Sequence, residues 1–405
     1  MVDSVLSPLA AFHSIRRIMA KDPQRREMIL HELEASRLDA LVSLSPTEVL
    51  LLTGYWPVMG TSLAICTREG GLCAVIPEDE LELAASTSNA EFFTYKPETL
   101  EHVAPVTSVI LDPVKKVISR LGLKSGKIGV DLSGGAQGSS YPSVHHFRLS
   151  ILPLLRESAP DLTSVSAGSI FERLKAVKSE TEIDILRRVC RRAAVGFSHA
   201  KLAIVAGRRE DEVAADIEAA FARDANDGLE RSRGYFFCMS GPNSYKASGA
   251  YARTRSRVLS KGDLVMIHAN TVGDGYWTDI TRTWIVGSPN DQQQRMYDAI
   301  GEARQAAFKA IATGVSAKSV DAAARSVLTD HGFGAAFKHA TGHGVGFTGA
   351  DGHALPRIHP QSTDTLQAGM TFNIEPAIYL EDVGGMRHCD VVASTHNGVE
   401  LLTDF

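Results

Sequence analysis

Four ionisable side chains stand inside apolar, glycine-flanked segments of the C-terminal half of the sequence. Asp279 lies in the second of two apolar runs in residues 262–286, which a Gly-Asp-Gly turn joins. His343 follows in T-G-H-G-V-G, Glu375 in F-N-I-E-P and Cys389 in G-G-M-R-H-C-D. An unpaired carboxylate is costly to bury, so such residues indicate either paired structural charges or a site. Taken together, they predict one site capable of acid–base or metal chemistry.

The segment around Asp279 reads as a β-hairpin, because two apolar runs flank a short turn sequence. Alternate residues of a strand share a face, so Asp279, Thr281 and Thr283 are predicted to point the same way. That polar face must be directed at something other than an apolar core.

The composition narrows the class of protein. The 405 residues suffice for two domains, and 44% hydrophobic with 22% charged residues is typical of a soluble globular protein. A net charge of −5 argues against a nucleic-acid binder, and no apolar run is long enough to span a membrane. Five cysteines without a C-x-x-C pair favour reduced thiols and a cytoplasmic location.

Two domains are expected, covering residues 1–165 and 166–405. Strand and helix patterns alternate in the first, which carries no chemical constellation of its own, and a polar stretch at residues 156–168 marks the boundary. A capping box formed by Ser179 and Glu182 then begins a long amphipathic helix. Further helices are predicted at residues 209–223, 291–312 and 315–330, ahead of and between the site strands, which gives the second domain α+β character.

The order D-I-T-R-T, T-G-H-G-V-G, I-E-P and G-G-x-R-x-x-D resembles the pita-bread family, which includes creatinase, prolidase, aminopeptidase P and methionine aminopeptidase. The likeness covers residues 166–405 strongly. Residues 38–46 and 51–54 are similar, more weakly, to the N-terminal domain of creatinase and prolidase. The resemblance implies an α+β fold, with a smaller N-terminal creatinase/prolidase-type α/β domain and a C-terminal pita-bread catalytic domain. It also implies a homodimer.

In metal-dependent members of that family, two Asp, one His and two Glu hold a pair of divalent ions. By resemblance, Asp279 is the bridging Asp, His343 the ligand His and Glu375 the first Glu. The first Asp is replaced by His268 and the last Glu by Cys389. Exchanging two carboxylates for an imidazole and a thiol favours one ion, Zn or else Mn, Co or Fe, held by these five residues.

Two further positions carry the family's proton-transfer groups. The histidine that precedes the hairpin is replaced by Tyr251, whose phenol could donate a hydrogen bond to a developing oxyanion. The second histidine corresponds to His353, shifted by an inserted T-G-A-D-G. Tyr251, His353 and Glu375 are therefore the expected catalytic residues.

Three functions remain open on the sequence. The first is a hydrolase of the Xaa-Pro peptidase and creatinase family, which cleaves a C–N bond of a small-molecule or dipeptide-like substrate with a reworked metal site. The second is a metal-independent, creatinase-like hydrolase in which Glu375 holds a cationic substrate group. The third is a non-catalytic binding module on the same fold. None of them requires a nucleic acid or a membrane.

Overall fold

The computed structural model describes residues 22–97, 105–132, 151–223, 227–248, 254–349 and 351–405. The chain divides into two compact units between Lys175 and Ala176, called unit 1 and unit 2 below. This division falls after the predicted boundary at residues 165/166. The reason is that the helix α7, Gly168–Ala176, is bonded to unit 1: Arg173 pairs with Glu32 at 2.6 Å, and Lys175 with Glu48 at 3.4 Å.

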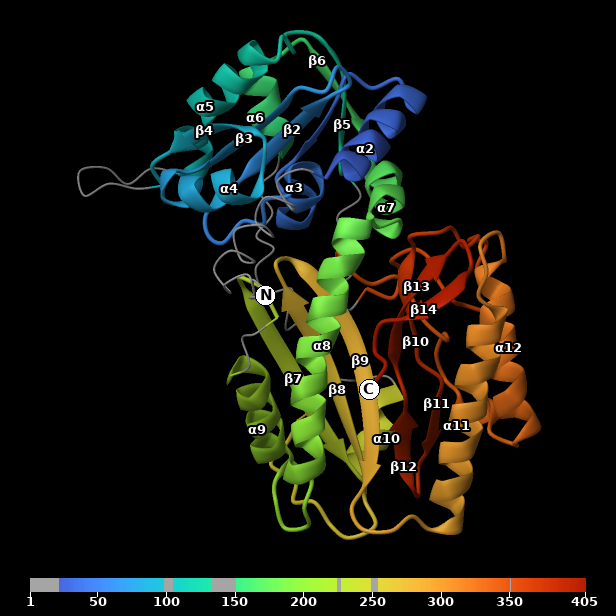
Figure 1. Cartoon of the computed structure of the whole chain (residues 1–405). Helices are drawn as coiled ribbons and strands as arrows, with labels where there is room; N and C mark the ends of the chain where they lie inside the picture. Colours follow the sequence, from blue (N-terminus) through green and yellow to red (C-terminus); the bar gives the residue numbers. More distant parts are fainter. Residues whose placement is uncertain (1–21, 98–104, 133–150, 224–226, 249–253, 350) are drawn as a thin grey trace, which may run out of the picture. The chain divides into compact units, whose positions relative to one another are not determined.

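Unit 1 is an α/β domain built on one six-stranded mixed sheet in the order β4-β3-β2-β1-β5-β6. Its strands are β1 Ala40–Ser43, β2 Leu63–Thr67, β3 Leu72–Pro77, β4 Glu91–Tyr95, β5 Gly126–Val130 and β6 Leu162–Ser166. Its helices are α2 Pro23–Ala35, α3 Pro46–Thr53, η1 Glu78–Glu80, α4 Leu81–Thr87, α5 Val106–Arg120, α6 Ile151–Ser158 and α7. Apolar residues of the strands pack against α5 and α6 to form its core (Figure 1).

Unit 2 combines long helices with three small sheets. Its helices are α8 Glu180–Ala203, α9 Glu210–Arg223, α10 Pro242–Tyr245, η2 Lys246–Ser248, α11 Asp291–Ala310, α12 Ala317–Asp330 and η3 Gly334–Ala336. Its strands are β7 Ser232–Ser240, β8 Leu264–Gly273, β9 Tyr276–Ile285, β10 Thr371–Ile374, β11 Ala377–Leu380, β12 Gly384–Arg387, β13 Asp390–Thr395 and β14 Gly398–Leu401. Figure 1 shows α8 and α9 along the β7–β9 sheet, and α11 and α12 along the later strands. The predicted α+β character of this half is confirmed, as is the capping box of Ser179 and Glu182 at the start of α8.

The β8–β9 hairpin is a long, regular ribbon closed by a two-residue turn. Asp274 and Gly275 both have positive φ, 48° and 92°, as a type I′ turn requires. The turn sets a register that pairs His268 with Thr281 and Asn270 with Asp279. Since alternate residues of a strand share a face, these four side chains lie on one face of the hairpin.

The C-terminal strands reach this face through backbone pairing. Thr281 N–H donates to Cys389 O at 3.3 Å, and Cys389 N–H donates to Thr281 O at 3.0 Å. Thr283 Oγ1 in turn donates to Arg387 O at 2.9 Å. The segment from Arg387 to Cys389 is thereby held against the polar face of β9.

Asp390, which follows that segment, is a buried carboxylate that accepts hydrogen bonds from two guanidinium groups. Arg282 Nη2 donates to Asp390 Oδ1 at 2.8 Å, and Arg304 Nε donates to Asp390 Oδ2 at 2.8 Å. Asp390 is fully buried and Arg282 is 7% exposed. Their charges therefore have little access to water and depend on one another.

Replacing Asp390 with Asn is expected to lower the free energy of unfolding by about 3–5 kcal/mol, because it leaves Arg282 buried without a carboxylate. Urea denaturation measures the loss. Asp382→Asn, at an exposed position, is the control, and its effect should stay within about 0.5 kcal/mol. Equal urea midpoints for Asp390→Asn and the unchanged protein would contradict the structural role given to this network.

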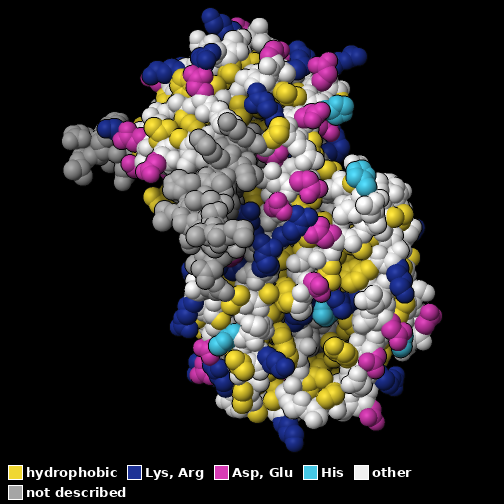
Figure 2. Space-filling model, viewed as in Figure 1, with side chains coloured by type: hydrophobic (Ala, Val, Ile, Leu, Met, Phe, Trp, Pro, Cys, Tyr) yellow, Lys and Arg dark blue, Asp and Glu magenta, His cyan; other side chains and the backbone are white. Residues whose placement is uncertain are grey.

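Acidic and basic side chains are interspersed over the described part of the face in Figure 2. Among the helices described, none combines the length and the apolar character that crossing a membrane demands.

Candidate functional site

The predicted site residues of unit 2 converge. Asp279, Glu375 and Cys389 each offer a ligand atom, and these three atoms lie within 4.8 Å of one another. His343 Nε2 lies 3.6 Å from Asp279 Oδ2, and His268 Nδ1 lies 3.5 Å from Asp279 Oδ1. Asp279 is therefore the centre of the cluster, with one imidazole near each of its carboxylate oxygens.

His343 is positioned by a loop that two glycines allow to approach other backbone closely. A Cβ on Gly342 would lie 1.9 Å from Asn373 O, and one on Gly344 would lie 2.0 Å from Leu355 O, so neither position accepts a side chain. His343 N–H donates to Asn373 Oδ1 at 2.6 Å, and the ring Nδ1 lies 3.1 Å from Gly344 O. A proton on Nδ1 satisfies that carbonyl and leaves Nε2 facing Asp279.

Asp279 and His343 form a buried ion pair in this arrangement. Burial alone would lower the pKa of His343, but the carboxylate of Asp279, 3.6 Å away, and the charge of Glu375 raise it to about 9. Burial opposes ionisation of Asp279 too, yet the neighbouring histidines hold its pKa below the usual value. Burial raises the pKa of Glu375 to about 7, which places its proton transfer close to neutral pH.

His268 enters the site as a hydrogen-bond acceptor. Its Nδ1 lies 3.0 Å from Arg387 Nη2 and 3.0 Å from Thr281 Oγ1. A guanidinium can only donate, so Nδ1 must accept, and the ring proton is on Nε2. Burial lowers the pKa of His268 to about 4, which also makes the ring neutral. The Nδ1 lone pair of His268 is thus engaged by Arg387.

Arg387, Tyr379 and His339 complete a chain of buried polar groups that the sequence interpretation did not assign. Arg387 Nη1 donates to Tyr379 Oη at 3.3 Å, and Tyr379 Oη lies 3.0 Å from His339 Nε2. Since His339 Nδ1 lies 2.8 Å from Ala340 O, a proton there leaves Nε2 to accept from the phenol. Burial lowers the pKa of His339 to about 4. The G-G-x-R motif and the histidine four residues before His343 were the available signals.

Cys389 touches Asp279 directly. Its Sγ lies 3.1 Å from Asp279 O and 3.7 Å from Asp279 Oδ1. Burial and the nearby carboxylates raise the pKa of the Cys389 thiol well above its usual value. A cation that took Cys389 as a ligand would have to displace this proton.

The two other predicted catalytic residues are not among the described residues of the cluster. His353 is exposed, and its backbone N–H donates to Asp351 Oδ1 at 3.0 Å. The described cluster contains His339 in place of His353. Tyr251 lies outside the described residues.

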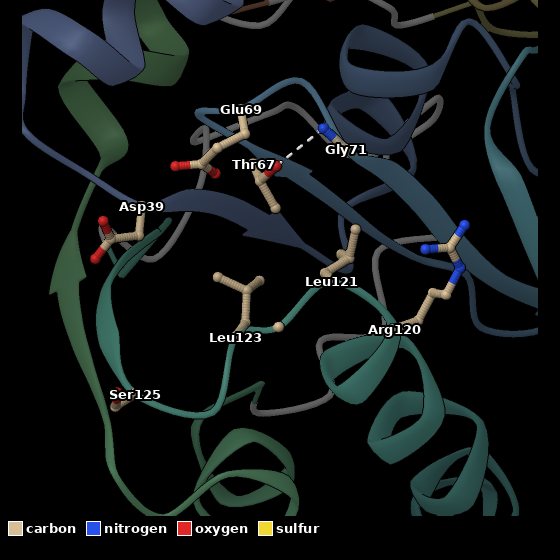
Figure 3. A pocket seen from close by; sticks show the side chains of 9 residues that line it. Asp39, Thr67, Glu69, Gly71, Arg120, Leu121, Leu123 and Ser125 are labelled. Atoms are coloured by element: carbon tan, nitrogen blue, oxygen red, sulfur yellow. Dashed lines mark hydrogen bonds between the residues drawn. The ribbon is translucent and has the colours of Figure 1, made fainter.

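A hollow of about 440 Å³ on unit 1 offers a second place to look for a ligand (Figure 3). Its charged groups already have partners: Arg68 Nη2 bonds to Asp39 Oδ1 at 2.9 Å, and Arg120 pairs with Glu91 at 3.0 Å. Thr67 Oγ1 accepts from Gly71 N–H at 2.9 Å. The hollow therefore has the character of a surface depression between partnered side chains.

Residues 184–396 match the family model of metallopeptidase family M24, and this range contains the whole cluster. The chain belongs to family M24. The predicted pita-bread relationship and two-domain fold are thereby confirmed, and the chain is an enzyme of a peptidase family.

Relatives in family M24 extend the similarity over both units. The chain is 28% identical over 380 residues to an Xaa-Pro dipeptidase of Pyrococcus horikoshii, which covers 94% of this chain and 97% of the relative. It is 36% identical over 280 residues to a probable dipeptidase PepE of Mycobacterium tuberculosis, covering 68% and 70%. The crystal structure of the prolidase from Pyrococcus horikoshii superposes with a TM-score of 0.75 at 26% identity, covering 94% of this chain and 98% of that one.

The family name implies a divalent metal, and the donor atoms of the clustered side chains determine whether this M24 chain can bind one. Asp279, Glu375 and Cys389 bring two carboxylates and a thiol within 4.8 Å of one another, and the imidazole of His343 lies 3.6 Å from Asp279, a donor set that suits one divalent cation. A second cation beside it would need a carboxylate at His268, where Arg387 is hydrogen-bonded instead. The residues present fit one ion and do not fit a pair.

Proposed function

We propose that this M24 chain hydrolyses a C–N bond of a dipeptide-like substrate with one divalent cation held by Asp279, His343 and Glu375, and that Cys389 completes the shell. The observation that carries the proposal is the convergence of the donor atoms of Asp279, Glu375 and Cys389 within 4.8 Å. The dipeptide class is supported by the relatives named Xaa-Pro dipeptidase and dipeptidase PepE. Zinc suits this mixture of oxygen, nitrogen and sulphur donors better than manganese does.

A bound cation would polarise the scissile carbonyl and lower the pKa of a water molecule. The chain's own groups do the rest. Glu375 is placed to take a proton from that water molecule and return it to the leaving amine. Asn373 orients the ring of His343, because its Nδ2 lies 3.2 Å from His343 Nε2 while its Oδ1 accepts from the His343 backbone N–H. Tyr251 as a donor to the oxyanion, and His353 as a further proton carrier, stay predictions.

A specific observation argues against the creatinase-like alternative. Without a cation, His343 pairs with Asp279 at 3.6 Å, and Arg387 lies 3.9 Å from Glu375, so two positive groups balance two carboxylates. Such a site is electrically neutral and could hold a cationic substrate group only by giving up one of these pairs. We therefore place the metal-dependent hydrolase first. The homodimer and the cytoplasmic location stay predictions.

Metal analysis separates the two functions. Protein purified without a His tag is expected to contain about one equivalent of a transition metal per chain. Chelation should abolish hydrolysis of Xaa-Pro dipeptides, and adding Zn²⁺ or Mn²⁺ back should restore it. Full hydrolytic activity in protein that holds no metal would overturn the cation and favour the creatinase-like chemistry.

A further inference from the structure

Arg387 is a buried cation held almost entirely by neutral groups. It is 5% exposed. Its Nε donates to Thr281 Oγ1 at 3.1 Å, its Nη1 to Tyr379 Oη at 3.3 Å and its Nη2 to His268 Nδ1 at 3.0 Å. The carboxylate near it, Glu375 Oε2, lies 3.9 Å from Nε. The guanidinium is firmly oriented, but its charge is weakly compensated.

Arg282, on the same strand as Asp279, shows the usual solution to burying a guanidinium. Its Nη2 bonds to Asp390 Oδ1 at 2.8 Å. The guanidinium of Arg387 has five N–H donors, and three of them are used by the neutral acceptors. One hydrogen on each of Nη1 and Nη2 therefore remains for a further acceptor, and carboxylate oxygens are the acceptors that form the strongest hydrogen bonds with a guanidinium.

The charge balance of the proposed cation site favours an anion wherever Cys389 keeps its proton. Asp279 and Glu375 together then neutralise one divalent cation, which leaves the charge of Arg387 over, whereas a Cys389 thiolate bound to the cation would balance it. His268 does not reduce it, because its ring is neutral and accepts through Nδ1. An Asp at position 268 would place a carboxylate against Arg387 and cancel that charge.

We infer that Arg387 binds an anionic oxygen group of the substrate, its carboxylate, and that His268 is the positioning residue that keeps this guanidinium oriented without neutralising it. The inference rests on the proposed function and names its substrate class: dipeptides or N-acyl amino acids with a free carboxylate. Arg387 thus supplies a fixed positive charge in the part of the site where a second cation would lie.

The test compares acetate with acetamide, which have the same shape and differ by one charge. Binding is followed by the ¹⁵N–¹H resonance of Arg387 Nε–H, assigned through its loss in Arg387→Lys. Acetate is expected to shift the resonance and acetamide to leave it in place. His268→Asp should weaken acetate binding at least about tenfold, because the new carboxylate would pair with the buried guanidinium of Arg387. His268→Asn has nearly the same shape as His268→Asp and no charge, so it should retain binding.

The inference is overturned if acetate leaves the Arg387 resonance unmoved, or if His268→Asp binds acetate as well as His268→Asn does. Should His268→Asp fail to fold, ligand-observed saturation transfer on Arg387→Lys and Arg387→Gln decides: Lys should retain a preference for acetate over acetamide and Gln should lose it. Equal preference in the two Arg387 variants also overturns the inference.

The titration needs neither turnover nor metal, so it is run before and after chelation, and the ranking of the variants should be the same. Acetate binding at Arg387 in a protein that hydrolyses the dipeptide with no metal bound would rule out the proposed cation alone. If the protein is active and contains metal but acetate does not shift the Arg387 resonance, only the role of Arg387 is ruled out.

Discussion

Asp279→Asn is expected to lower the turnover of an Xaa-Pro dipeptide at least about a hundredfold, because it removes the charge at the centre of the cluster. One oxygen of Asp279 lies 3.6 Å from His343 Nε2, and a carboxylate oxygen of Asp279 lies within 4.8 Å of ligand atoms of Glu375 and Cys389. An amide keeps the shape but loses the attraction for a cation. Glu375→Gln should have a loss of similar size, because it removes the group whose proton transfers near neutral pH.

Steady-state kinetics and metal content together check this prediction. Glu381→Gln, on the exposed turn between β11 and β12, is the control, and its turnover and metal content should both equal those of the unchanged protein. Asp279→Asn should lose bound metal as well as turnover, whereas a general-base role for Glu375 alone would spare part of the metal in Glu375→Gln. Undiminished activity in the double variant Asp279→Ala, Glu375→Ala would place the chemistry elsewhere.

The parts of the fold that the sequence predicted well depend on local chemistry. The β8–β9 hairpin follows from apolar alternation and from Asp274-Gly275, whose positive φ values suit a type I′ turn. The start of α8 follows from its capping box. Neither prediction requires knowledge of residues far along the chain.

The domain boundary needed tertiary information. Residues 156–168 are polar and look like a linker, but α7 follows them and is joined to unit 1 through Arg173 and Lys175. A local composition change cannot show which side a helix packs on. The division at Lys175 therefore lies beyond the polar stretch that marked it in the sequence.

Within the site, residue types were predictable and their roles were less so. Motif order placed Asp279, His343, Glu375 and Cys389 in one site. The role of His268 depends on Arg387, which is 119 residues away in the chain and is brought to it by the bonds of Thr281 to Cys389 and of Thr283 to Arg387. Motif spacing likewise pointed to His353 after the insertion, but it could not show that His353 is exposed.

His339 illustrates the same limit. It stands four residues before His343 in an apolar segment, where an uncharged structural histidine is a common finding. The structure shows its Nε2 3.0 Å from Tyr379 Oη, so it fixes the phenol that accepts from Arg387. Its importance is a property of the hydrogen-bond chain, which no single motif contains.

Restoring both lost carboxylates is expected to give the site room for a second cation. The variant His268→Asp, Cys389→Glu adds two negative charges next to Asp279, which offsets the charge of one more divalent ion. Hard oxygen donors would then predominate, so the preferred metal should move from Zn²⁺ towards Mn²⁺ or Co²⁺. Metal content measured after equilibration with each ion should rise from about one to about two equivalents per chain.

The matched control is His268→Asn, Cys389→Gln, which has nearly the same volume and adds no charge, so its metal content should stay at that of the unchanged chain. The single variant His268→Asp should gain little, because Arg387 Nη2 already lies 3.0 Å from the position-268 ring and would pair with the new carboxylate first. A second ion in the double variant would therefore have to compete with Arg387 for that carboxylate. If the double variant gains no metal, the guanidinium of Arg387 itself excludes the second cation. Creating a site for two metal ions would then require replacing Arg387 as well.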